Sequence, residues 1–210
     1  MQTLILVFGG IFWILTYIFI ISKGFKDKTY GMPLIALCAN VSWEFIYSFI
    51  FPHTPPQLFI NYLWFGLDVI IVIQFLKYSK NEFLNLTSAK LYSIFILLLV
   101  SEFSIILLSS FITGEVKGAY TAFSQNLVMS VLFIIMLFKR KSLRGQSIYI
   151  AVFKMLGTGL TSLHYYVYEP ITHSSFILPT LYVLIFTFDI VYILLILRFY
   201  KKNKMSVLKI

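Results

Sequence analysis

Four acidic residues and one lysine lie deep inside long apolar runs of this 210-residue sequence. The acids are Glu44, Asp68, Glu102 and Asp189, and the base is Lys154. A charge at the centre of a bilayer costs about 2.5–3.5 kcal/mol or more, so such residues usually face a protein interior or a cavity. With one base for four acids, some acids must be neutral or share a proton. Because burial disfavours an ionised carboxyl group, we expect these acids to hold protons out of water.

Helical spacing predicts which residues share a face with each charge, because side chains three or four positions apart meet on one side of a helix. All four acids fall in the central half of the predicted bilayer, so we expect them to converge on one intramembrane cavity. Lys154 is expected to neutralise one acid, and Asp189 is the partner at matching depth. The residues expected on the charged faces are Asn40, Tyr47, Asn61, Trp64, Thr158, Thr161, Tyr165, Tyr182, Phe186 and Tyr192.

Aromatic residues make up 19% of the sequence, and several of them border the acids. Aromatic faces stabilise cations, and they do so more strongly where water is excluded. A protonated acid among such faces in an apolar pocket suits carbocation chemistry on a hydrophobic substrate. The aromatic residues that border the acids are Trp43, Trp64, Tyr47, Phe186 and Tyr192.

The elements that must position these residues are apolar runs of about 20 residues, the length that crosses a hydrocarbon core of roughly 30 Å. Hydrophobic residues form 60% of the sequence and charged residues only 12%. We predict an all-α integral membrane protein with a single domain over residues 1–210, folded as a seven-transmembrane helix bundle. The predicted spans are 2–22, 32–51, 58–77, 91–112, 119–138, 147–168 and 176–198.

Basic residues are concentrated in alternate loops, after the first, third, fifth and seventh predicted spans. Lys117 is the one basic residue predicted for the opposite side. Because basic loops stay in the cytoplasm, this pattern predicts an outside N-terminus and a cytoplasmic C-terminus. The net charge of +9 therefore indicates a lipid bilayer as the partner, and not a nucleic acid.

Three short motifs resemble those of the small integral-membrane terpene cyclases. They are NVSWEF at 40–45, LWFGLD at 63–68 and FTFDIVY at 186–192. This family comprises cyclases of fungal meroterpenoid and indole-diterpene pathways, with bacterial relatives that act on prenylated indoles. The length and the seven-span layout also match. The resemblance implies that Glu44 and Asp189 are the essential acids and that neither a metal nor another cofactor is needed.

The resemblance further implies that Glu44 and Asp189 form an acid–base system that acts on a hydrophobic prenylated small molecule, free or attached to an aromatic head group. One acid protonates an alkene or epoxide, the cation closes rings, and a second group removes the last proton. We expect Asn40 to orient Glu44 by hydrogen bonding. The residues expected to bind substrate are Asn40, Trp43, Tyr47, Trp64, Asp68, Glu102, Lys154, Phe186 and Tyr192.

The composition is rich in Phe, Ile and Lys, which suggests an AT-rich bacterial genome and hence the bacterial cytoplasmic membrane. The main alternative function is a small proton-coupled transporter with seven helices, because buried acids and the PPQ sequence at 55–57 also fit such carriers. A visible internal repeat, which many carriers show, is missing. Retinal binding is excluded because the last span holds no lysine between Ser175 and Leu197. A non-catalytic sensory protein and any oligomeric state stay open.

Overall fold

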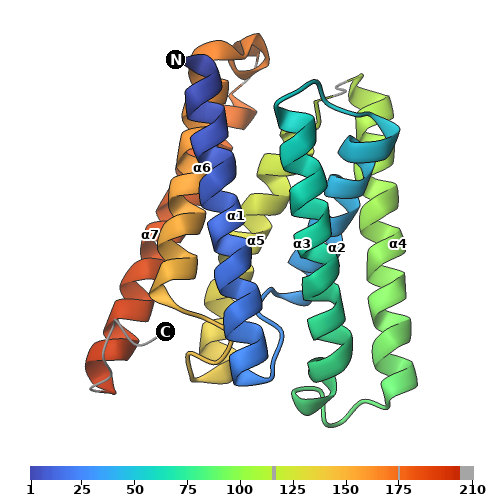
Figure 1. Ribbon diagram of the computed structural model, residues 1–210, viewed down its shortest axis with the longest axis vertical. Helices are drawn as coiled ribbons and strands as arrows, with labels where there is room; N and C mark the ends of the chain where they lie inside the picture. Colours follow the sequence, from blue (N-terminus) through green and yellow to red (C-terminus); the bar gives the residue numbers. More distant parts are fainter. Residues whose placement is uncertain (115–116, 175, 204–210) are drawn as a thin grey trace.

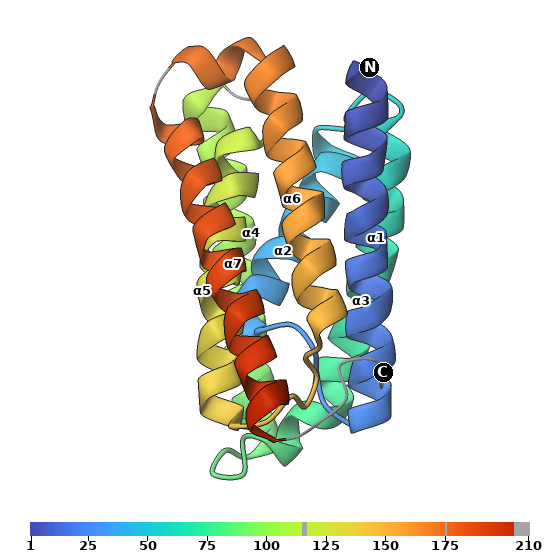
Figure 2. The same ribbon diagram turned by 90° about the vertical axis from the view of Figure 1, so that its left-hand side faces the viewer.

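The computed structural model describes residues 1–114, 117–174 and 176–203, and these residues form seven α-helices (Figures 1 and 2). Each predicted span falls on one of them, which confirms the predicted helical architecture. Short helical turns follow α2, α3 and α6 at Ile46–Ile50 (η1), Ser79–Asn81 (η2) and Pro170–Ser174 (η3). The seven helices are α1 (Gln2–Asp27), α2 (Leu34–Phe45), α3 (Gln57–Tyr78), α4 (Ser88–Thr113), α5 (Ala119–Arg140), α6 (Ile148–Tyr168) and α7 (Ile177–Lys202).

Within the described residues, α1, α3, α4, α5 and α7 are long and apolar enough to cross a membrane. At 1.5 Å per residue, a helix of this class is about 33 Å long or more, which exceeds a hydrocarbon core of about 30 Å. α2 and its extension run only from Leu34 to Ile50. α6 is less apolar because it contains Lys154 and His164. That all seven helices cross the bilayer stays a prediction.

The hydrogen-bonding pattern of α2 changes after Phe45, the residue that follows Glu44. The segment Ile46–Ile50 is a π-helix, and the amide of Phe51 donates to the carbonyl of Ile46 at 2.8 Å. Pro52 then ends the segment, because proline has no amide hydrogen to donate. A π-helical turn holds more residues than an α-helical turn, so the ideal offsets of three and four change along Ile46–Ile50.

α1 packs closely along α6 because glycines lie at their contact. A Cβ atom on Gly157 of α6 would lie 2.7 Å from Cδ1 of Trp13 on α1. A Cβ atom on Gly9 of α1 would lie 3.0 Å from Oγ1 of Thr161 on α6. The missing side chains let the two backbones approach, and this approach fixes Trp13 on the interior side of α1.

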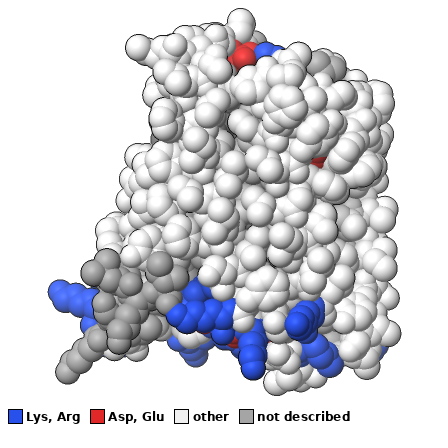
Figure 3. Space-filling view, viewed as in Figure 1, with Lys and Arg blue, Asp and Glu red and all other residues white. Residues whose placement is uncertain are grey.

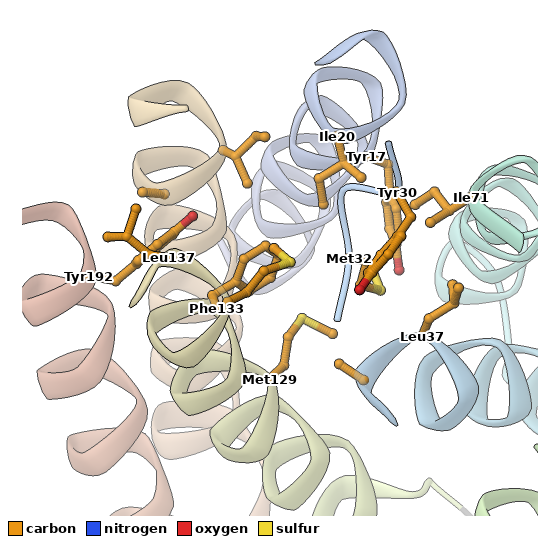
Figure 4. Close-up of a cluster of buried hydrophobic side chains, with 14 of the residues drawn as sticks. Tyr17, Ile20, Tyr30, Met32, Leu37, Ile71, Met129, Phe133, Leu137 and Tyr192 are labelled. Carbon is orange, nitrogen blue, oxygen red and sulfur yellow. The ribbon is translucent and has the colours of Figure 1, made fainter. Parts of the chain in front are cut away.

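The largest cluster of buried hydrophobic side chains draws residues from all seven helices, and Figure 4 shows part of it. Ile20, Leu37, Ile71 and Phe133 are each fully buried in it. Tyr17 belongs to the same cluster and also forms part of a cavity wall. The bundle is therefore solid near the 28–33 loop, and its interior opens on the other side of Tyr17, toward the N-terminus.

Lys and Arg side chains gather at one end of the molecule, as the face in Figure 3 shows. At this end the guanidinium of Arg140 donates to the Glu82 carboxylate at 2.9 Å and to the Tyr30 carbonyl at 2.9 Å. Arg144 donates to the Asp27 carbonyl at 3.1 Å. These arginines therefore tie three loops together besides charging this end. The charge asymmetry agrees with the predicted orientation, which itself stays a prediction.

Candidate active site

A cavity of about 90 Å³ lies among α1, α2, α3, α5 and α6. The helices bring both aromatic and polar side chains to its wall, so the cavity has a mixed lining. The aromatic lining residues are Trp13, Tyr17, Trp43, Trp64, Phe123 and Tyr165. The polar lining residues are Asn40, Glu44, His53, Gln57, Gln125, Asn126, Thr158 and Thr161.

Glu44 is the acidic residue on the wall of this cavity, and only 3% of its surface is exposed. Its Oε2 atom is buried and has no hydrogen-bond partner among the described residues. Those residues also place no lysine, arginine or histidine in an ion pair with it. A neutral carboxylic acid fits this environment, because an unpaired buried charge is strongly destabilising.

Asp68 of α3 lies behind the cavity wall, fully buried. Asn40 Nδ2 donates to Asp68 Oδ2 at 2.8 Å and also to the Tyr17 hydroxyl. The expectation that Asn40 orients Glu44 is therefore wrong: its amide hydrogens serve α3 and α1. Spacing along α2 predicted a shared face but gave no information on which neighbouring side chains reach Asn40.

Lys154 and Asp189 form the predicted ion pair, with Nζ 2.8 Å from Oδ1 and no more than 2% of either side chain exposed. The ammonium group also donates to Asn126 Oδ1 at 2.9 Å and to Ser130 Oγ at 2.7 Å. These three partners use all three ammonium hydrogens. Asn126 then donates to Thr158 Oγ1 at 3.0 Å, which connects the pair to the cavity wall.

Asp189 itself does not line the cavity of Glu44. It lies at a groove of about 590 Å³ between α6 and α7, whose lining is mostly apolar. The expectation that all four acids face one cavity is therefore wrong. Asp189 lies away from the cavity because Lys154 binds its carboxylate at the junction of α5, α6 and α7.

Two of the predicted aromatic residues, Trp43 and Trp64, line the cavity. Trp43 is held there by its indole N–H, which donates to the Gly118 carbonyl at 3.1 Å. Tyr47 does not reach the wall, because its hydroxyl bonds with Ser110 of α4. Its ring packs against those of Trp43 and His53, with centroid distances of 4.6 and 5.3 Å.

The remaining predicted residues lie elsewhere. Phe186 is 50% exposed and borders the groove between α6 and α7. Tyr192 is part of the hydrophobic core (Figure 4), where its hydroxyl donates to Gln146 at 2.8 Å. Glu102 is half-buried on α4 and does not line the cavity. The structure therefore does not bring these three to Glu44.

A wider vestibule of about 630 Å³ adjoins the cavity at the end that holds the N-terminus. The vestibule and the cavity share Leu6, His53, Gln57 and Tyr165 in their linings. The cavity is therefore continuous with this end of the molecule, where Lys117 and Glu169 form an ion pair of 2.7 Å.

His53 stands at the boundary of vestibule and cavity, and both its ring nitrogens are engaged. Asn61 Nδ2 donates to the Tyr47 carbonyl at 3.1 Å, which identifies it as the NH₂ end of the amide. The same NH₂ group lies 2.9 Å from His53 Nδ1. His53 Nδ1 is then an acceptor, and Nε2–H donates to the Lys117 carbonyl at 3.2 Å. Burial of the ring lowers the pKa of His53, which agrees with a neutral imidazole.

Sequence reasoning missed several wall residues, notably Trp13, Gln125 and Asn126. A signal for the last two was present: side-chain amides in the middle of an apolar run are costly unless they bond inside the protein. Asn126 and Ser130 also stand four positions apart, which puts them on one helix face. Trp13 offered no such signal, because aromatic residues are frequent throughout the chain.

Residues 1–202 match the model of a protein family described as Pyr4-like transmembrane terpene cyclases. Over 155 residues the chain is 33% identical to asnovolin H synthase nvfL of Aspergillus novofumigatus, covering 71% of this chain and 63% of that protein. It is 30% identical over 158 residues to terpene cyclase penB of Penicillium crustosum, covering 72% and 64%. Terpene cyclase andB of Emericella variicolor is 40% identical over 75 residues, covering 35% and 32%.

The chain thus spans between about a third and just under two-thirds of the length of these relatives. No solved structure matches it. The relatives are fungal, which contradicts the expected bacterial source and leaves the bacterial membrane without support. Membrane helices and basic loops by themselves enrich Phe, Ile and Lys, so the composition could not carry that inference. The family match favours a cyclase over the transporter alternative.

Proposed function

Because the chain belongs to the Pyr4-like transmembrane terpene cyclases, we propose that it cyclises a hydrophobic prenyl chain in the cavity beside Glu44. One observation carries the proposal: a buried carboxyl group without an ion-pair partner, on an aromatic wall, among the described residues. This is the environment in which a carboxylic acid can protonate a weak base and the resulting cation survives.

In the proposed reaction, Glu44 transfers its proton to a terminal alkene carbon or epoxide oxygen of the chain. With an alkene, the π electrons form the new C–H bond and leave a carbocation. With an epoxide, an oxygen lone pair takes the proton, and the C–O bond breaks with its electron pair on oxygen to leave the carbocation and a hydroxyl group. Further double bonds attack the cation and close rings, while the faces of Trp13, Trp43 and Trp64 stabilise the charge. The final cation loses one proton to a basic group, and the Glu44 carboxylate is reprotonated, which ends the sequence and restores the acid. One proton enters and one leaves, so the net reaction is an isomerisation without a co-substrate.

The acid–base role expected for Asp189 stays a prediction. We propose that Asp189 acts through Lys154, because its carboxylate is bound to the ammonium at 2.8 Å. That ammonium orients the Asn126 amide, which lines the cavity and bonds to Thr158. Asp189 would then be a positioning residue that keeps one wall of the cavity in place. The proposed orientation places the N-terminus and the vestibule outside.

The groove between α6 and α7 supports a route by which the prenyl chain reaches the cavity from the lipid. It opens sideways from the bundle, and its apolar lining includes the half-exposed Phe186. Thr158 lines both the groove and the cavity, so a single side chain separates them at that point. Gly159, beside Thr158, leaves the groove open because none of the described residues comes within 4 Å of a Cβ atom built on it.

The test is Glu44→Gln, assayed in membranes with prenylated aromatics and linear terpenoids, each with and without an epoxide. Glutamine keeps the shape and removes the acidic proton, so we expect folded protein and a loss of about 100-fold or more in product formation. Glu102→Gln is the matched control, because it removes a membrane-depth acid that lies outside the cavity. Full product formation by folded Glu44→Gln contradicts the proposal.

A further inference from the structure

A second cavity, of about 470 Å³, lies at the end of the molecule where Lys and Arg side chains gather (Figure 3). We call it the basic-end pocket. α2 packs against both α4 and α5, and the pocket lies among these three helices and the loops that hold Tyr30, Phe83 and Ser142. Among the described residues, its lining shares no member with the cavity beside Glu44 or with the groove between α6 and α7. The pocket is therefore a separate feature that the proposed reaction does not use.

Most of the pocket wall is apolar and extends away from the charged end. On α5 the lining runs from Lys139 back to Leu132, seven positions earlier, which is about 10 Å at 1.5 Å per residue. Ile135 on α5 and Ile35 on α2 are exposed, so the pocket opens sideways toward the surrounding lipid. The other apolar residues of the wall are Pro33, Leu34, Phe83, Leu98 and Met136. An apolar slot that opens at membrane depth fits part of an acyl chain.

The charged residues of the lining carry a net positive charge, with Lys139, Arg140 and Arg144 against Glu82. Arg140 and Glu82 neutralise each other in an ion pair of 2.9 Å. Arg144 donates to two backbone carbonyls near the end of α1, at 3.1 and 2.8 Å. Within the part of the chain that the structure describes, neither Arg144 nor Lys139 has a carboxylate in an ion pair. The lining therefore holds two positive charges without a counter-ion from those residues.

The aromatic part of the wall positions the Lys139 ammonium group. Its Nζ atom lies 5.0 Å from the centroid of the Phe83 ring, and this ring itself lines the pocket. Phe83 stacks on Tyr30 with ring centroids 6.2 Å apart, and Cζ of Arg140 lies 4.6 Å from the Tyr30 centroid. The ammonium is therefore held against the pocket wall, where its hydrogens are available to an anionic oxygen.

We propose that the basic-end pocket binds one anionic glycerophospholipid. The phosphate group bonds to the Lys139 ammonium, and one acyl chain lies along Leu132 and Ile135. Basic pockets between membrane helices on the cytoplasmic side bind anionic lipid head groups, and the predicted orientation puts this end there. A free phosphate ion would leave the apolar wall uncovered, and a hydrocarbon would leave the ammonium without an anion. A ligand with both parts satisfies the whole lining.

The test titrates the purified full chain in neutral detergent micelles with phosphatidylglycerol or with phosphatidylcholine that carries the same acyl chains. Native mass spectrometry counts the bound lipids. Wild type should hold one phosphatidylglycerol at least about 10-fold more tightly than phosphatidylcholine, because a hydrogen bond between two charged groups is worth that much. The melting temperature should rise with phosphatidylglycerol, because a ligand that binds only the folded state stabilises it.

Two pairs of variants separate this pocket from the general charge of the basic end. Lys139→Gln should weaken phosphatidylglycerol binding about 10-fold. Lys141→Gln removes the same charge from an exposed residue outside the lining, where salt screens it, and should leave binding near the wild-type value. Ile135→Trp keeps every charge but fills the slot, so it should also weaken binding. Val128→Trp is its control, since this exposed residue of α5 lies outside the pocket.

Equal affinity of wild type for the two lipids overturns the proposal. Equal losses in Lys139→Gln and Lys141→Gln overturn it too, because the basic end then attracts anions only as a surface. Inorganic phosphate that displaces phosphatidylglycerol or raises the melting temperature alone would make the ligand a free anion and not a lipid. If Lys139→Gln does not fold, the Ile135→Trp and Val128→Trp pair decides. Binding is measured without turnover, so the result is independent of the proposed cyclisation.

Discussion

Replacing both members of the Lys154–Asp189 pair should be far less harmful than replacing either one. Asp189→Leu leaves the ammonium buried with only two neutral partners, Asn126 and Ser130. Lys154→Met leaves the carboxylate buried with no counter-charge at 2.8 Å. The double variant Lys154→Met/Asp189→Leu removes both charges and keeps similar side-chain volumes. The three variants with wild type form a double-mutant cycle.

The magnitude follows from the geometry of the pair. Two unit charges 2.8 Å apart attract by about 6 kcal/mol at an effective dielectric constant of about 20. Desolvation costs several kcal/mol for each ion, so the net contribution of the intact pair is near zero. Removing one partner forfeits the attraction and keeps the other ion's desolvation, which costs about 3–5 kcal/mol. The double variant should therefore lie within about 2 kcal/mol of wild type.

Unfolding of purified protein in lipid–detergent mixtures measures the free energies, and product formation per folded molecule measures activity. If Asp189 is a positioning residue, the folded double variant should retain at least about a tenth of wild-type activity. A folded double variant without any product would refute this reasoning and make Asp189 a group that exchanges protons with the substrate. A double variant as unstable as the single ones would refute the electrostatic argument.

Two further predictions concern access and pH. Gly159→Phe should fill the groove between α6 and α7 and lower kcat/KM about 10-fold. Gly66→Phe is the control and should have little effect, because Gly66 lies on α3, away from this groove. Both positions can hold a larger side chain, since none of the described residues comes within 4 Å of a Cβ atom added at either glycine. Equal effects in a cyclisation assay would exclude this route. Because burial lowers the pKa of His53, the unfolded chain binds more protons below the ordinary value of 6.5, so stability should fall as pH drops through that value. Melting temperatures from pH 7.5 to 5 should fall more for wild type than for His53→Gln, and parallel curves would contradict this assignment.

The seven helices and the ion pair could be predicted because each depends on the order of residues along the chain and not on how the helices pack. A bilayer imposes a fixed length on an apolar run, so all seven helices match the predicted spans to within a few residues at most ends. Lys154 and Asp189 stand at equal depth on successive spans, and a buried ammonium needs an anion. Neither inference required knowledge of how the helices are rotated.

Helix rotation and local irregularity could not be predicted from the same information. Asn40 was assigned to Glu44 because both lie on one stripe of α2, yet helix packing turns its amide toward Asp68 and Tyr17. Tyr47 lies on the same stripe, but its hydroxyl bonds with Ser110 of α4 and does not reach the cavity wall. A stripe identifies a face, and only the packing of the other helices decides what that face meets.

The cavity shows why neutral polar residues deserve the same scrutiny as charged ones in a membrane sequence. A charge is conspicuous in an apolar run, and it is often satisfied by a built-in partner, as Lys154 is. Gln125 and Trp64 drew less notice as polar groups, yet their polar atoms are the ones left without partners beside Glu44. Since hydrocarbon surroundings penalise unbonded amides and indoles as well as charges, an unpartnered neutral group is better evidence for a ligand than a paired ion.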